Sequence, residues 1–274
     1  MSRPYSFLWH LGRAVFFQAF RPSFFMAVFT TYFDASGNKR TSVLTVAGFV
    51  SRVSKWDRFN SEWSAILSRE HVTSMHMTDF ASTEKQFKSW RGQSERRRKF
   101  ISDLTDCIRR NTNKGFAASV YISDYNEVDK EYMVREALGQ PFTLCAPTCL
   151  GALKSWAERK HMKPEQVLVL IERGDDDQAE FIKVARIDGF KVVCLNKEDA
   201  QAFQAGDIAG WKSRIVLQNV VFAPVVTRED AEKIVRSLDP IRKILRVNQG
   251  FDKSGLLRIC AKGGIPRRGA LRMR

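Results

Sequence analysis

Two β-rich runs separated by a short turn constrain the fold of this chain most strongly. The runs, residues 28–33 and 43–50, are dense in β-branched and aromatic side chains. Between them lies Ser36-Gly37-Asn38, a composition typical of a turn. Strands joined by so short a connection pair antiparallel, because parallel neighbours need a long crossover. The sequence therefore predicts an antiparallel hairpin of residues 27–33 with 43–50.

A second group of patterns predicts an α/β sheet flanked by helices. The unbroken branched run Val167–Ile171 is typical of a strand covered on both faces. Two more strands are predicted at 115–123 and 190–195. Apolar residues recurring every three or four positions predict the helices. These helices cover residues 54–68, 94–110, 141–160, 175–187, 200–217 and 229–245.

The bulk composition favours one domain with extensions. The chain has 274 residues, 44% of them hydrophobic, and no linker long enough to separate two independent domains. We expect residues 26–250 to form the domain, with an insertion around 54–112. Residues 1–25 are interpreted as an N-terminal extension and 251–274 as a basic C-terminal tail.

The cysteines and the apolar runs indicate whether the protein is cytoplasmic, secreted or membrane-bound. The five cysteines are scattered without the spacing of a zinc site, which fits reduced thiols in a cytoplasmic protein. No apolar run is long enough to span a bilayer, and residues 6–25 lack a small-residue cleavage site. We expect a cytoplasmic protein that has no membrane partner.

The net charge indicates the kind of partner. Lys and Arg number 45 against 30 Asp and Glu, a formal net charge of +15. Such an excess favours a polyanion, with nucleic acid ahead of an anionic membrane. The alternative is a solvated basic surface that has no specific partner.

Three acidic residues stand where a carboxylate is destabilising unless positive charge meets it. Asp34 follows the first β run and Glu172 ends the central one, so both lie at strand ends, where sites form in α/β sheets. Asp207 lies between Phe203 and Trp211 on a predicted helix, and it is expected to face the sheet.

The helix that carries Asp207 has a stripe of small side chains. The stripe consists of Ala202, Ala205, Gly206, Ala209, Gly210 and Ser213. Small residues at helical spacing let a helix backbone approach a sheet closely.

Three carboxylates that converge in a basic protein describe a two-metal phosphodiesterase site, with Mg²⁺ or Mn²⁺ as the ion. We expect the carboxyl groups to lie within roughly 8 Å of one another and at least one to have a raised pKa. Simpler interpretations remain open: Asp34 as a turn former, or Glu172 paired with Arg173. Candidate auxiliary or substrate residues are Ser36, His76, Asp79 and Asp175. The acids of 175–177 are better interpreted as helix-capping residues, although one of them could supply a fourth ligand.

Two short motifs give a family resemblance. The segment 32–37, Tyr-Phe-Asp-Ala-Ser-Gly, resembles the Asp-Glu-Ser-Gly signature of the family called domain of unknown function 3800. The segment 204–210 is similar to that family's Gln-x-Ala-Asp-x-x-Ala helix motif. The match would cover about 26–214, and it departs from the family at Ala35 and Gly206.

The resemblance implies a ribonuclease-H-like fold, in which acids on the first strand, a central strand and a late helix bind catalytic metals. Carried over to this chain, these acids are Asp34, Glu172 and Asp207. The loop holding His76 and Asp79 lies where such proteins carry a short His-containing segment.

We therefore predict a ribonuclease-H-like mixed α/β sheet, and prefer it to a PIN-type nuclease sheet because of the tight first hairpin. The predicted function is a divalent-metal-dependent nuclease or a related phosphodiester-processing enzyme. The alternatives are a non-catalytic nucleic-acid-binding module and a phage-defence or mobile-element interaction protein of the same fold.

Overall fold

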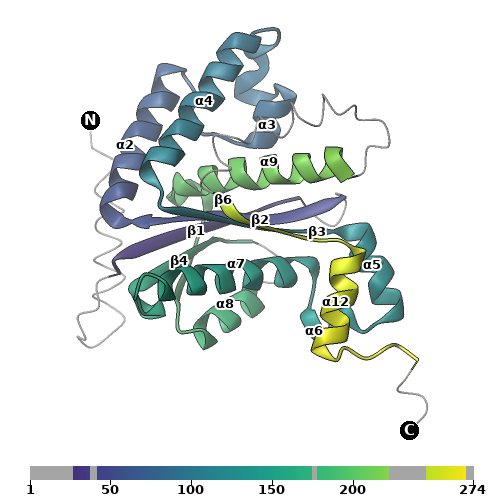
Figure 1. The fold of residues 1–274 in the computed structure, drawn as a ribbon. Helices are drawn as coiled ribbons and strands as arrows, with labels where there is room; N and C mark the ends of the chain where they lie inside the picture. The colour runs from purple at the N-terminus through teal and green to yellow at the C-terminus, as the bar shows by residue number, and fades with distance from the viewer. Residues whose placement is uncertain (1–26, 38–41, 175–177, 222–244, 270–274) are drawn as a thin grey trace.

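A six-stranded mixed sheet runs through the centre of the molecule (Figure 1). The computed structural model describes residues 27–37, 42–174, 178–221 and 245–269. Within them the strands lie in the order β5-β4-β1-β2-β3-β6. Their bounds are β1 Phe29–Ser36, β2 Val43–Arg52, β3 Lys114–Tyr121, β4 Val167–Glu172, β5 Lys191–Leu195 and β6 Leu245–Phe251.

The strand pairings confirm the predicted architecture. β1 and β2 form the antiparallel hairpin, and β3 extends it antiparallel to β2. Parallel strands complete both sides, with β4 beside β1, β5 beside β4 and β6 beside β3. This sheet, an antiparallel start continued by parallel strands and flanked by helices, is the ribonuclease-H-like arrangement predicted from the sequence.

Helices cover both faces of the sheet (Figure 1). One layer contains α2 (Val53–Arg69), α3 (Met77–Ser82), the 3-10 turn η1 (Lys85–Trp90), α4 (Ser94–Asn111) and α9 (Ala202–Val221). The other face carries α7 (Pro141–Glu158) and α8 (Gln178–Ile187), with α5 (Ile122–Glu131), α6 (Val134–Leu138) and α12 (Lys253–Gly263) grouped beyond the end of the sheet. None of the described helices combines the length and the apolarity needed to cross a membrane.

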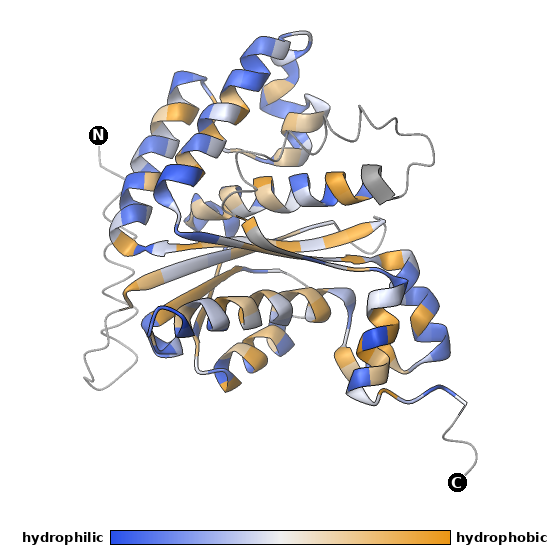
Figure 2. Ribbon diagram, in the orientation of Figure 1, coloured by the Kyte–Doolittle hydropathy of each residue, from blue (hydrophilic) through white to orange (hydrophobic). Residues whose placement is uncertain are grey.

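Each face of the sheet has its own hydrophobic core. Apolar residues are frequent along the strands, and hydrophilic residues are frequent on α2 and α4 (Figure 2). Successive side chains of β1 point to opposite faces of the sheet. Tyr32 packs in the core under α9, and Phe33 packs in the core beneath α7 and α8. Asp34 and Ser36 share the face of Tyr32, so both face α9.

Most predicted helices and strands are confirmed within a few residues, but the first strand is longer than expected. β1 continues to Ser36, so Asp34 lies inside the hairpin opposite Ala47 and not at its tip. β3 ends at Tyr121, two residues earlier than predicted, because helix α5 begins at once.

The interpretation of residues 251–274 as a basic tail is wrong at the level of secondary structure. Residues 253–263 form α12, which Asp252 caps by accepting a hydrogen bond from the Gly255 amide at 2.7 Å. Leu256 and Cys260 are buried on its inner face, so apolar packing holds this segment on the domain. The predictions made for residues 1–25, 175–177 and 229–244 lie outside the described residues.

Candidate active site

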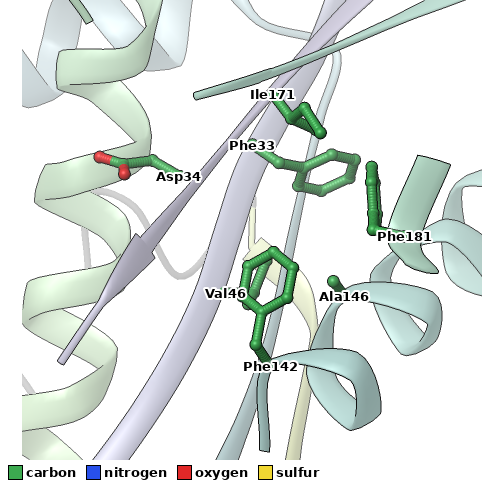
Figure 3. A pocket seen from close by; sticks show the side chains of 7 residues that line it. All are labelled: Phe33, Asp34, Val46, Phe142, Ala146, Ile171 and Phe181. Atoms are coloured by element: carbon green, nitrogen blue, oxygen red, sulfur yellow. The ribbon is translucent and has the colours of Figure 1, made fainter. Parts of the chain in front are cut away.

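The first two predicted carboxylates lie side by side on adjacent parallel strands, Asp34 within β1 and Glu172 at the end of β4. Phe33 of β1 is in register with Ile171 of β4, so the next residues, Asp34 and Glu172, follow side by side. Because successive side chains alternate, both lie on the face opposite Phe33 and Ile171. Figure 3 shows the Asp34 carboxyl on the side of the sheet away from those two residues. Asp34 is 5% exposed and Glu172 is half-buried.

Asp207 reaches the same place because α9 approaches the sheet very closely. A Cβ atom added to Gly206 would lie 3.0 Å from Asp34 Cβ and 3.3 Å from the Ala47 carbonyl oxygen. One added to Gly210 would lie 3.0 Å from Ser36 Cβ. The expectation that the small-residue stripe permits close approach is therefore confirmed. It leaves Asp207, 6% exposed, beside the strand that carries Asp34.

Helix α9 also holds the segment leading into α3. The Met77 amide donates a hydrogen bond to Asp207 Oδ2 at 2.9 Å. One turn earlier, Gln204 Oε1 accepts from the Met75 amide at 2.7 Å and from Trp63 Nε1 at 3.0 Å. The carboxylate of Asp207 is thus oriented by a backbone donor, and its other oxygen has no hydrogen bond among the described residues.

A lysine that sequence reasoning missed lies between the first two acids. Lys197 Nζ is 3.0 Å from Asp34 Oδ2 and 3.4 Å from Glu172 Oε2. It belongs to the 3-10 turn η3 (Lys197–Asp199), directly after β5. Because β5 runs parallel to β4, a residue just past its end lies beside the end of β4. Lys197 is identified by that strand order and not by any local sequence motif.

The electrostatics show that the three acids act on one another. Burial, a hydrogen bond with Glu172 and the negative charges of Glu172 and Asp207 raise the pKa of Asp34 well above its usual range, against the opposing charge of Lys197. Burial alone would lower the pKa of Lys197, but the charges of Asp34, Asp207 and Glu172 raise it above its ordinary value. The expected raised carboxyl pKa is therefore found at Asp34.

Further cations lie along α9. Arg214 Nε donates to Ser36 Oγ at 3.4 Å, and the charge of Asp207 acts on its guanidinium. Burial lowers the pKa of Arg214, with Asp207 opposing that shift. Lys212 is 8% exposed, and burial lowers its pKa to about 8. Ser36, a candidate auxiliary residue, thus contacts a cation that lies next to the acids.

The remaining auxiliary candidates lie at the edge of this region. His76 Nδ1 is 3.5 Å from Asp79 Oδ2, and Lys85 Nζ approaches the same oxygen at 2.9 Å. His76 is adjacent to Met77, which contacts Asp207, but within the described residues no contact joins the imidazole to the three acids. Asp175 lies outside the described residues.

The donor chemistry of the cluster fits a hard divalent cation. Carboxylate oxygens are the ligands that Mg²⁺ and Mn²⁺ prefer, and three acids that destabilise one another's charge would be stabilised by such an ion. Across the described ranges, however, no group of three or more His, Cys, Asp or Glu side chains is arranged to hold a metal. The ammonium group of Lys197 lies between the carboxyl oxygens of Asp34 and Glu172, where a metal ion shared by these two residues would lie.

A small hollow borders Asp34 on the opposite face. Its lining consists of Phe33, Asp34, Val46, Phe142, Ala146, Ile171 and Phe181 (Figure 3). The Asp34 carboxyl points away from it, toward α9, while the other side chains gather against α7 and α8. The hollow is therefore a gap in the apolar core and not part of the acidic site.

Comparison with known proteins gives distant structural similarity but no match at the level of sequence. No family model and no curated protein matches the sequence, so the resemblance to domain of unknown function 3800 stays a prediction. The ribonuclease HII in the PCNA:RNase HII complex from Archaeoglobus fulgidus is similar in structure, with a TM-score of 0.39 and 14% identity. The alignment covers 78% of this chain and 90% of that one. A similarity so distant says nothing about activity.

Proposed function

We propose that this chain is a divalent-metal-dependent nuclease or a related phosphodiester-processing enzyme. Asp34, Glu172 and Asp207 are the proposed metal-binding and catalytic residues. One observation carries the proposal: acids from β1, β4 and α9, far apart in sequence, gather on one face of the sheet and raise the pKa of Asp34. Burial of several acids together is destabilising unless a cation compensates them, so such a cluster is typical of a functional site.

The chemistry follows from the donor set. Bound there, Mg²⁺ or Mn²⁺ would supply an activated water and would stabilise the leaving oxygen of a phosphodiester. The chain's own residues would hold the ion through the three carboxylates and would meet the phosphate with the nearby Arg214. The net charge of +15 supports a nucleic acid as the substrate, because counterion release favours binding of a polyanion to a basic protein.

The substitution Asp207→Asn tests this function with little disturbance of the fold. The asparagine carbonyl oxygen can still accept the hydrogen bond from the Met77 amide, while the charge that would bind metal is gone. We expect Mg²⁺- or Mn²⁺-dependent cleavage of DNA or RNA to fall at least about 100-fold, since loss even of outer-sphere support weakens metal sites by 10–100-fold. Nucleic-acid affinity should be unchanged or higher, because one negative charge has been removed.

The matched control is Asp106→Asn. Asp106 is a half-buried acid on α4 that pairs with Arg109 on its own helix, at 3.1 Å. The control removes the same charge far from α9, and it should cleave like the wild type. Equal losses in both variants would show that general charge, and not the cluster, controls activity.

A non-catalytic nucleic-acid-binding module is the second candidate, and one observation favours it. Lys197 forms ion pairs with two of the three acids, so part of the buried negative charge is compensated without any metal. If the wild type binds DNA or RNA but cleaves neither with Mg²⁺ or Mn²⁺, this alternative is the better account.

A further inference from the structure

The position of Lys197 bears on how many metal ions the acidic cluster can take. Its ammonium nitrogen lies 3.0 Å from Asp34 Oδ2 and 3.4 Å from Glu172 Oε2. A divalent ion shared by those two oxygens would lie about 2.1 Å from each. The ammonium and the ion would therefore occupy nearly the same place, and their like charges would repel strongly at that separation.

Lys197 is partly buried and is held in a fixed position within the cluster. Its side chain is only one-quarter exposed, and the acids of all three elements act on its charge. The turn that carries it is fixed on both sides, because Asp199 Oδ2 accepts hydrogen bonds from the Asn196 amide at 3.0 Å and from Asn196 Nδ2 at 3.1 Å. The backbone thus presents Lys197 to the ends of β1 and β4.

The net charge of the cluster also limits how many divalent ions it can bind. When ionised, as metal binding requires, Asp34, Glu172 and Asp207 carry three negative charges, and Lys197 and Arg214 contribute two positive ones. One divalent ion then leaves a single positive charge, which one phosphodiester group balances. Two divalent ions would leave three positive charges in a largely buried place, which is strongly unfavourable.

We infer that Lys197 serves as one of the two cations of the site, so that the three acids take a single divalent ion. Lys197 is a positioning residue that acts through Asp34 and Glu172. The inference rests on the proposed function, since it takes the cluster to be a metal site. It departs from the two-metal arrangement expected from the sequence.

The experiment is a titration of the full chain with Mn²⁺, in which bound and free metal are separated by electron paramagnetic resonance. The wild type should bind one Mn²⁺ per chain. Lys197→Met should bind two, or bind one at least about tenfold more tightly, because a positive charge within 4–6 Å shifts ionic equilibria by one to three powers of ten. Lys197→Arg keeps the charge and should bind one Mn²⁺ with wild-type affinity.

Lys183→Met is the matched control. Lys183 is an exposed lysine of α8, on the opposite side of the sheet, and it pairs with Glu180 at 3.6 Å. Its loss should leave one Mn²⁺ bound. A circular-dichroism melt establishes that each variant is folded, and the wild-type stoichiometry decides the matter even if Lys197→Met does not fold.

Two Mn²⁺ bound by the wild type would overturn the inference and leave the nuclease proposal standing. So would an unchanged stoichiometry and affinity in folded Lys197→Met. The predicted change from one ion to two without any cleavage would support the inference and refute the nuclease. No bound Mn²⁺ in any variant would overturn both.

Discussion

The close approach of α9 to β1 can be tested by adding one methyl group at Gly206. Alanine is favoured over glycine inside a helix by about 0.8–1.0 kcal/mol. At Gly206, however, the added carbon would lie 3.0 Å from Asp34 Cβ and 3.3 Å from the Ala47 carbonyl oxygen, both on the paired central strands. Neither atom belongs to a flexible side-chain end, so the helix must move, and overpacking of this kind costs typically about 1–3 kcal/mol.

A matched glycine isolates the packing contribution. Gly151 lies in α7, is exposed, and an added Cβ there would meet no atom within 4 Å. Gly151→Ala should therefore raise the free energy of unfolding by about 0.8–1.0 kcal/mol. Gly206→Ala should change it by about zero to minus 2 kcal/mol, leaving the two variants about 1–3 kcal/mol apart.

Urea unfolding followed by tryptophan fluorescence measures both variants. The midpoints should separate in the stated order while the slope stays unchanged, since the same surface is exposed on unfolding. A Gly206→Ala protein stabilised as much as Gly151→Ala would refute the idea that α9 touches the sheet there. Because a shifted α9 carries Asp207 with it, the folded Gly206→Ala protein should also bind Mn²⁺ more weakly than the wild type.

Two further predictions concern buried polar groups of α9. Gln204→Leu leaves the Trp63 indole and the Met75 amide without their acceptor, so the free energy of unfolding should fall by about 2–5 kcal/mol in the same urea assay; a loss under about 1 kcal/mol would contradict these bonds. Burial lowers the pKa of Lys212 to about 8 from 10.5, so the folded state binds fewer protons and wild-type stability should rise between those pH values. Lys212→Met should lack that rise; parallel pH profiles of the wild type and the variant would refute this assignment.

The sequence predicted the sheet well where local patterns are strong. The hairpin and β4 follow from dense branched residues, and the periodic apolar positions gave α2, α4, α7 and α9. β6 was missed because Leu245–Phe251 contains Asn248, Gln249 and Gly250, and its place at the sheet edge is fixed by pairing with distant β3. α12 was missed although Asp252 is a good capping residue, because its apolar positions Leu256 and Cys260 are few and stand among basic residues.

The site was predicted in part for a similar reason. Asp34, Glu172 and Asp207 were candidates because an acid beside apolar residues is conspicuous in a sequence. Lys197 is not conspicuous, since lysine is common on surfaces and its turn has no motif. Only the order of the strands, with β5 beside β4, places it against Glu172. Contacts that depend on strand order are therefore the part of the site that local patterns do not reveal.

The central position of β1 has a consequence for the order of folding. β1 pairs with β2 across a short turn, but its other edge receives β4, whose Leu168 is in register with Thr30. The hairpin can form early because its strands are neighbours in sequence, whereas β3, β4 and α9 close long loops and such contacts form slowly. Since Glu172 and Asp207 come from those later segments, the hairpin that carries Asp34 exists before the cluster does. A refolding chain would therefore acquire its acidic cluster only after this hairpin has formed.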